Sequence, residues 1–131
     1  MHRGVMGLTV MVVEDDTGLR HIYQRILTAL GCATLLATDG QEALYLLGVH
    51  SPDLLVLDMR LPQISGTQII DYILSDPRFA TMHVIMTSAD PGYERQARRL
   101  PSAQFHLKPL LASDLRTMLQ QYIEKASSLS A

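Results

Sequence analysis

Short apolar runs alternate with amphipathic stretches along most of the chain. The runs are rich in Val, Leu and Ile, last only a few residues and stop at polar side chains, which is typical of strands buried on both faces of a sheet. They lie at 9–13, 32–37, 54–58, 83–87 and 104–107. Apolar residues in the stretches between them recur three and four positions apart, which is the spacing of one face of an α-helix.

This spacing predicts five helices, at 19–30, 43–48, 69–74, 93–100 and 111–123. Asp16 or Thr17 is placed to cap the start of the first helix, and Ser113 is a candidate N-cap for the last. The fourth helix lies between Pro91 and Pro101, which leaves room for only about two turns. We therefore expect this helix to be shortened or irregular.

Five successive strand–helix units predict an α/β domain, in which right-handed crossovers place helices on both faces of a parallel sheet. For five units the commonest doubly wound arrangement is the flavodoxin-like three-layer sandwich, with strand order 2-1-3-4-5 and its switch point between the first and third strands. No repeat, linker or low-complexity segment interrupts the pattern. Residues 1–131 are therefore expected to form a single domain with a core of about residues 9–125.

The bulk composition narrows the class of protein. A chain of 131 residues with 47% hydrophobic residues is large enough to bury a core, and its net charge of −2 gives no support to direct binding of nucleic acid. The single cysteine, Cys32, excludes an intramolecular disulfide and fits a reducing compartment. Residues 1–7 lack the apolar run of a signal peptide, and no segment approaches the roughly 20 apolar residues that cross a bilayer. We therefore expect a cytoplasmic domain that does not bind membranes.

Polar side chains follow four of the predicted strands at the point where each strand ends. Glu14 and Asp15 follow the first strand, Asp58 ends the third, and Ser88 and Lys108 follow the fourth and fifth. In the expected order the first and third strands are neighbours, so the three carboxylates would meet at the switch point, where such sheets bind ligands. Carboxylates this close repel one another, and Mg²⁺, which prefers oxygen ligands, is the natural compensation. The sequence therefore predicts a magnesium site at this edge.

Ser88 and Lys108 would add a hydroxyl and an ammonium group to the same edge. Both suit the oxygens of a phosphoryl group, and an aspartate held between such donors and a cation can attack phosphorus to give an aspartyl phosphate. Taken singly, a serine at a strand end is usually a turn residue, and a lysine before proline is usually a solvated loop charge. The convergence of all five side chains favours the functional interpretation. The histidines share no common face and are expected at the surface or at the edges of elements: His2, His21, His50, His83 and His106.

These residues make the chain resemble the receiver domain of bacterial two-component response regulators, the chemotaxis-type receiver superfamily. The resemblance runs from residue 9 to about residue 125. It rests on the acidic run VVEDD at 12–16, DGQEAL at 39–44, LDMRLP at 57–62, Ser88-Ala89 and Lys108-Pro109. Asp58 lies 43 residues after Asp15 and 30 residues before Ser88, and both spacings are ordinary for receivers.

The resemblance implies a role for each site residue. Asp58 would be the phosphoacceptor. Asp15 and Asp58 would bind Mg²⁺ directly, whereas Glu14 would act through water. Arg60 would supply a backbone carbonyl oxygen to the same ion.

At the fourth and fifth strands, Lys108 and Ser88 would hold the phosphoryl oxygens, and the Lys108–Pro109 bond would be cis. Phe105 occupies the position of the family's switch aromatic, which turns inward when Ser88 moves toward the phosphate. Lys108 lies 20 residues after Ser88, which is slightly short for the family and agrees with a truncated fourth helix.

The function that the resemblance implies is a phosphorylation-dependent signalling switch in a phosphorelay. A sensor histidine kinase or a histidine phosphotransfer protein would donate the group to Asp58, and the switched surface would bind a downstream protein or an output domain outside this chain. The domain would catalyse only its own phosphorylation and dephosphorylation, so we would not class it as an enzyme. The face made by the fourth helix, fifth strand and fifth helix would report phosphorylation and is a candidate homodimer surface.

Other functions stay open at this point. An interaction module that keeps the fold but works without phosphorylation is supported by the irregular fourth-helix segment and opposed by the presence of all five site side chains. A hydrolase with an aspartyl-phosphate intermediate is disfavoured, because such enzymes generally want a second acid where this chain has Arg60. Arg60 could also pair with Asp90 across the mouth of the site and slow dephosphorylation, although two solvated side chains are the simpler interpretation.

Overall fold

A computed structural model describes residues 7–130 of the chain, with the side chains of residues 7–126. Its strands are β1 (Thr9–Val13), β2 (Ala33–Ala37), β3 (Leu54–Asp58), β4 (His83–Ser88) and β5 (Ala103–Leu107). Its α-helices are α1 (Thr17–Ala29), α2 (Gly40–Val49), α3 (Gly66–Leu74), α4 (Glu94–Ala97) and α5 (Ala112–Ser130). Two short 3₁₀ helices, η2 (Pro77–Phe79) and η3 (Pro91–Tyr93), flank β4. Among these described elements, no helix is both long and apolar enough to cross a bilayer.

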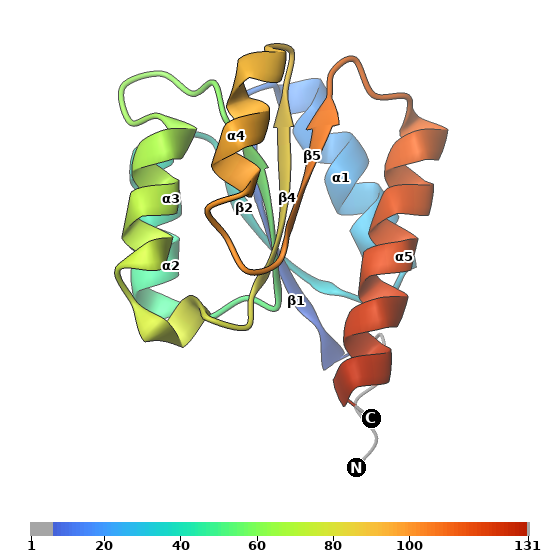
Figure 1. The fold of residues 1–131 in the computed structure, drawn as a ribbon. Helices are drawn as coiled ribbons and strands as arrows, with labels where there is room; N and C mark the ends of the chain where they lie inside the picture. Colours follow the sequence, from blue (N-terminus) through green and yellow to red (C-terminus); the bar gives the residue numbers. More distant parts are fainter. Residues whose placement is uncertain (1–6, 131) are drawn as a thin grey trace.

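The strands form one parallel sheet in the order β2-β1-β3-β4-β5, which confirms the predicted topology (Figure 1). In this register Val12 of β1 is opposite Val56 of β3, and Asp58 at the end of β3 is opposite Thr87 of β4. The carboxyl ends of β1, β3 and β4 therefore lie side by side. The switch point predicted between the first and third strands falls where Glu14 follows Val13 and Asp58 ends β3.

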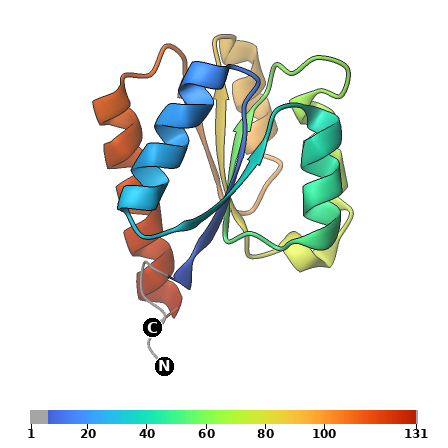
Figure 2. The ribbon, with the colours of Figure 1, turned by 180° about the vertical axis from the view of Figure 1, so that it is seen from behind.

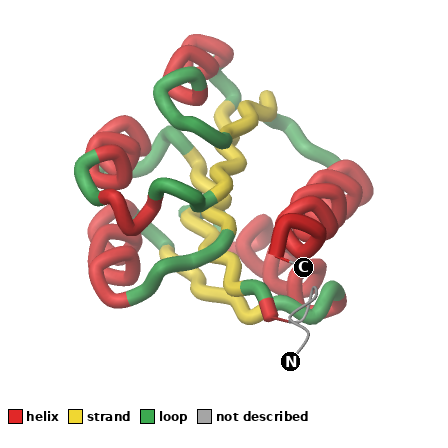
Figure 3. Tube along the Cα trace, turned by 60° about the horizontal axis from the view of Figure 1, so that its bottom comes forward, coloured by secondary structure: helices red, strands yellow, loops and turns green. Residues whose placement is uncertain are grey.

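Helices cover both faces of the sheet (Figures 1 and 2). Viewed from its lower end, the sheet is a central layer with α1 and α5 on one side and α2, α3 and α4 on the other (Figure 3). Because successive strand residues point to opposite faces, β1 divides its side chains between two cores. Val10 and Val12 pack into the core between the sheet and helices α1 and α5, which we call the α1/α5 cluster. Met11 and Val13 pack into the core under α2 and α3.

Side-chain caps fix where the helices begin. Asp16 Oδ1 accepts a hydrogen bond of 2.7 Å from the Leu19 amide, so Asp16 rather than Thr17 is the N-cap of α1. The predicted cap at Ser113 is wrong. The Leu111 carbonyl already accepts the Leu115 amide at 3.0 Å, and α5 begins at Ala112, so Ser113 lies inside the first turn.

The fourth helix is short, as the flanking prolines predicted. The chain leaves β4 through η3 and makes only the four-residue helix α4 before reaching β5. Asp90 caps η3, since its Oδ1 accepts the Gly92 amide at 2.8 Å. Just after α4, Arg99 forms an ion pair of 2.5 Å with Asp71 of α3. The short helix is therefore attached to its neighbour on the same face of the sheet.

Gly66, the first residue of α3, packs closely against the chain that follows Asp58. A Cβ at this position would lie 2.6 Å from Met59 Cα and 2.7 Å from Met59 Sδ. Because part of this clash is with backbone, we expect Gly66→Ala to lower the free energy of unfolding by about 1–3 kcal/mol, as measured by urea denaturation.

Gly48→Ala is the matched control for Gly66→Ala. A Cβ on Gly48, in α2, would approach only Tyr72 Oη, at 4.0 Å. Since alanine favours a helix over glycine, the control should gain about 0.5–1 kcal/mol. Equal effects of the two substitutions would show that Gly66 is not required for the close approach to Met59.

Candidate functional site

Three carboxylates meet at the carboxyl edge of the sheet, as the sequence predicted. Glu14, Asp15 and Asp58 each place a carboxylate oxygen within 4.8 Å of the other two. Glu14 and Asp58 are buried, with 1% and 5% of their surfaces exposed, whereas Asp15 is exposed. The cluster therefore has a buried floor and a side open to solvent, and its oxygen-only ligands fit a hard divalent cation.

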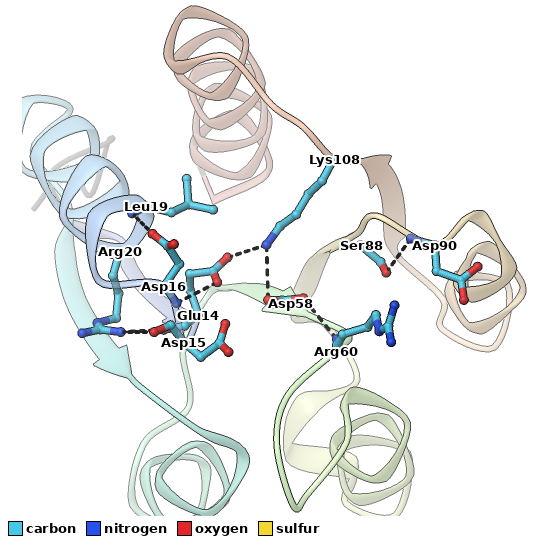
Figure 4. A network of polar contacts seen from close by, with 10 residues as sticks. All are labelled: Glu14, Asp15, Asp16, Leu19, Arg20, Asp58, Arg60, Ser88, Asp90 and Lys108. Atoms are coloured by element: carbon cyan, nitrogen blue, oxygen red, sulfur yellow. Dashed lines mark hydrogen bonds and ion pairs between the residues drawn. The ribbon is translucent and has the colours of Figure 1, made fainter.

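Lys108 crosses from the end of β5 to this cluster (Figure 4). Its Nζ donates to Glu14 Oε1 at 2.9 Å and to Asp58 Oδ2 at 3.2 Å. The backbone at Lys108 is held by a hydrogen bond, which its amide donates to the Ser88 carbonyl at 2.8 Å. The Lys108–Pro109 peptide bond is cis, as expected. One ammonium group thus bridges two buried carboxylates.

Burial sets the direction of the pKa shift at Glu14, whereas the carboxylate partners set it at Lys108. Burial raises the pKa of Glu14 from 4.5 to about 7, and this rise remains although the hydrogen bonds from Lys108 and the Asp16 amide act to lower it. Burial alone would lower the pKa of Lys108, but its hydrogen bond to Glu14 and the charge of Asp58 outweigh that effect and raise it. Lys108 therefore stays charged, while Glu14 is poised to gain or lose a proton near neutral pH.

Ser88 and Arg60 lie on the other side of Asp58. Ser88 is fully buried, and its Oγ accepts the Asp90 amide at 3.0 Å. The Arg60 amide donates to Asp58 Oδ1 at 3.1 Å, while the Arg60 side chain is exposed. Within the described part of the chain no ion pair joins Arg60 to Asp90, whose carboxylate instead caps η3.

Arg20 is a site residue that the sequence reasoning missed. Its Nη1 donates to the Glu14 carbonyl at 2.9 Å and to the Asp15 carbonyl at 3.2 Å (Figure 4). Arg20 therefore holds the backbone of the acidic loop from the first turn of α1. The signal was its position one turn after the Asp16 cap, which directs a long side chain back toward the loop.

Phe105 and His83 lie outside the acidic cluster. Phe105 is half-buried in β5, packs against the core under α2 and α3, and lines an open cavity of about 390 Å³ beside Glu94 and Arg98 of the α4 segment. His83 was expected at an edge and lies at the start of β4, where its Nδ1 is 2.6 Å from Ser102 Oγ. It is therefore at the opposite end of the sheet from the carboxylates.

A second open cavity, of about 430 Å³, adjoins the cluster on the side of α1. Asp16, Leu19, Ala89 and Lys108 are among its lining residues. The Lys108 side chain is 22% exposed, so a ligand can reach this ammonium group from solvent. The site combines a cluster of cation ligands, a buried carboxylate at its centre and an ammonium group open to solvent. These groups together can bind a phosphoryl group.

Comparison with known families supports this chemistry. Residues 10–120 match the family model described as response regulator receiver domain. The chain is 27% identical over 127 residues to Protein PilG of Pseudomonas aeruginosa, a match that covers 95% of this chain and 94% of that protein. It is 28% identical over 123 residues to the polar-differentiation response regulator DivK of Brucella anthropi, covering 92% of this chain and all of DivK.

A longer relative matches over only part of its length. The chain is 30% identical over 110 residues to Regulator of RpoS of Escherichia coli, and this match covers 84% of the chain but 33% of that protein. The chain thus corresponds to about a third of the longer relative.

Solved structures agree with the fold. The chemotaxis response regulator CheY4 of Vibrio cholerae gives a TM-score of 0.78 at 20% identity, covering 87% of this chain and 97% of that one. The signal receiver domain of a LuxO repressor protein from Vibrio parahaemolyticus gives 0.80 at 22% identity, covering 94% and 95%.

Proposed function

This chain belongs to the response regulator receiver domain family, and we propose that it is a phosphorylation-dependent switch that accepts a phosphoryl group on Asp58. The observation that carries the proposal is the contact of one ammonium group, Lys108 Nζ, with both Glu14 and Asp58. A buried ion pair of this kind is weak evidence for stability, because desolvation offsets the attraction. Its value here is chemical, since it holds a cation where phosphoryl oxygens would arrive.

The donor in this proposal is a phosphohistidine of a sensor histidine kinase or of a histidine phosphotransfer protein. An Asp58 carboxylate oxygen attacks phosphorus, the O–P bond forms as the N–P bond breaks, and the imidazole leaves with the electron pair. Lys108 and Ser88 bind the phosphoryl oxygens during this transfer. The reaction modifies the chain itself, so the domain acts as a switch rather than as an enzyme with an external metabolite.

Asp15, Asp58 and the Arg60 carbonyl would hold Mg²⁺, with Glu14 acting through water. The three clustered carboxylates suit this ion because a hard cation relieves their mutual repulsion. When bound, Mg²⁺ supplies positive charge against the charge on the transferring group. The exposed position of Asp15 leaves the cluster open to the ion from solvent.

Ser88 connects the modified site to the surface. Its hydroxyl accepts the Asp90 amide at 3.0 Å at the entrance to η3. If the hydroxyl turns to a phosphoryl oxygen, this bond is lost and the segment that leads into α4 is released. Phe105 lines a cavity together with Glu94 and Ala97 of α4 and would follow the movement. The face made by α4, β5 and α5 would then present the changed surface to a downstream protein or to a second copy of the chain.

A receiver-fold interaction module that works without phosphorylation is the second candidate function. The observation that favours it is the four-residue α4, which leaves little regular structure on the face that would report the switch. The complete set of site side chains weighs against it.

Binding of beryllofluoride, a phosphoryl mimic, separates the two functions. The chain has no tryptophan, so amide chemical shifts rather than tryptophan fluorescence are the suitable signal. We expect Mg²⁺ with beryllofluoride to shift the amides around Asp58, Ser88 and Lys108 and also those of α4 and β5. The same titration with a chelator present is the control and should leave the spectrum unchanged. Absence of any Mg²⁺-dependent shift would favour the interaction module.

A further inference from the structure

Two hydroxyl groups are buried near the site without a hydrogen-bond partner. Tyr23 of α1 and Thr87 of β4 are each 1% exposed. Among the residues that the structure describes, Tyr23 Oη and Thr87 Oγ1 are the buried side-chain nitrogen or oxygen atoms that lack a partner. Native proteins pair nearly all such groups, so an unpaired hydroxyl calls for a physical reason.

Both hydroxyls lie on the face of the sheet that also carries the carboxylates. Val12, Val56 and Ile85 belong to the α1/α5 cluster together with Tyr23. Because side chains alternate along a strand, the residues two positions further on point to this same face. Those residues are Glu14, Asp58 and Thr87, and Asp58 and Thr87 are opposite each other in the β3–β4 register. Thr87 is therefore the direct neighbour of the central carboxylate.

Tyr23 reaches the same place from the helix above. Side chains on a helix lean toward its N-terminus, and α1 begins at the carboxyl edge of the sheet, where Asp16 caps it (Figure 2). The phenol therefore extends from the α1/α5 cluster toward the floor of the acidic site. Burial raises the pKa of Tyr23, and the charges of Glu14 and Asp58 raise it further. The phenol thus stays protonated and is a hydrogen-bond donor close to two carboxylates.

The contacts of Lys108 suggest why two hydroxyl donors stay unpaired beneath this site. Among the side chains that the structure describes, its ammonium group is the hydrogen-bond donor shared by Glu14 and Asp58 (Figure 4). A phosphoryl group on Asp58 would draw the ammonium group toward its own oxygens. Glu14 is 1% exposed, and although its Oε2 would keep the Asp16 amide at 3.1 Å, its Oε1 would then need another donor.

We propose that Tyr23 and Thr87 are positioning residues, whose hydroxyls hydrogen-bond the Glu14 carboxylate and the carbonyl oxygen of the Asp58 acyl phosphate from below when Lys108 turns to the phosphoryl group. This inference rests on the proposed function and adds to it how the Glu14 carboxylate and the acyl phosphate are stabilised after transfer. In the unphosphorylated protein the two hydroxyls have no hydrogen-bond partner, and they donate hydrogen bonds only in the phosphorylated state.

Tyr23→Phe and Thr87→Val test the inference, because each removes a hydroxyl and keeps the shape of the side chain. Urea denaturation without metal should show both variants to be as stable as the wild type or more stable, since an unpaired buried hydroxyl is lost. The affinity for beryllofluoride at saturating Mg²⁺, followed by amide shifts, should fall about tenfold for Tyr23→Phe, the size of one hydrogen bond to a charged group. Tyr45→Phe is the matched control, because Tyr45 is 69% exposed on α2 and should leave both measurements unchanged.

Each contrary outcome has a distinct meaning. If the wild type binds beryllofluoride and the affinity of Tyr23→Phe is within about twofold of the wild-type affinity, Tyr23 does not donate to the phosphorylated site. The proposed function would still stand. If Tyr23→Phe is less stable without metal and its affinity is unchanged, the hydroxyl is a structural group already bonded in the resting protein, which also overturns the inference. A wild type that gives no Mg²⁺-dependent response would overturn both the inference and the proposed function.

Discussion

Asp58→Asn is expected to abolish acceptance of a phosphoryl group while leaving the fold intact. The amide of asparagine lacks the anionic oxygen that attacks phosphorus, so labelling by acetyl phosphate and Mg²⁺ should fall at least about 100-fold. The side chain keeps its shape, and its Oδ1 can still accept the Arg60 amide that Asp58 Oδ1 accepts now at 3.1 Å. Intact-mass measurement of the incorporated phosphoryl group checks the result.

Asp58→Asn should also preserve the stability of the metal-free protein. Asp58 is 5% exposed and shares the cluster with two other carboxylates, so removing its charge relieves repulsion. The metal-free variant should therefore be no less stable than the wild type in urea.

Asp16→Asn is the matched control for this labelling experiment. It makes the same chemical change at the same edge of the sheet, and asparagine caps a helix as well as aspartate does. Its labelling should stay within about threefold of the wild type. If Asp58→Asn were labelled as fully as Asp16→Asn, the attacking group would be another residue.

Glu14→Gln is expected to have the largest effect on stability, and the effect should depend on pH. Burial raises the pKa of Glu14 from 4.5 to about 7. The folded state therefore holds this proton more tightly than the unfolded state does. The stability from this difference is complete below pH 4.5 and is lost as the pH rises to about 7.

Glutamine cannot ionise, so Glu14→Gln should escape this loss. Without metal we expect its free energy of unfolding to exceed that of the wild type by about 2–3 kcal/mol near pH 8 and by much less near pH 5. Urea denaturation at both pH values, with a chelator present, measures the difference. Added Mg²⁺ should then stabilise the wild type more than the variant.

Glu42→Gln is the control for Glu14→Gln. Glu42 is an exposed residue in the first turn of α2, and its Oε1 accepts the Thr38 amide, a bond that glutamine can keep. Because Glu42 is exposed, Glu42→Gln removes no buried charge and should lack the gain at high pH that burial gives Glu14→Gln. A Glu14→Gln variant that gained no more stability than Glu42→Gln between pH 5 and pH 8 would mean that Glu14 is not a buried, easily protonated acid.

The fold and the acidic edge could be predicted from the sequence because both follow from one-dimensional patterns. Short apolar runs ending in polar residues located the strands, and the doubly wound order then placed Asp58 beside Glu14 and Asp15. The spacing of Pro91 and Pro101 likewise allowed only a short α4. Such inferences succeed because strand ends and proline constraints are local, while the topology has few alternatives.

Contacts that depend on the rotation of a helix about its axis could not be predicted from the sequence patterns. Tyr23 has the spacing of an ordinary core residue, and only the packed structure shows that its hydroxyl is unpaired beneath the carboxylates. The contacts of Arg20 with the acidic loop likewise depend on side-chain direction. The wrong cap at Ser113 has a similar cause, because the hydrogen bond from the Leu115 amide to the Leu111 carbonyl starts α5 two residues earlier than a cap at Ser113 would.

The position of the phosphoryl group on the wild-type chain tests the central claim most directly. The protein is treated with acetyl phosphate and Mg²⁺, the aspartyl phosphate is reduced with borohydride, and the modified residue is identified by peptide mass spectrometry. We expect modification at Asp58 alone, with none when a chelator replaces Mg²⁺. Modification of a different residue, or an unmodified chain under conditions that label a known receiver, would contradict the assignment of Asp58 as the phosphoacceptor.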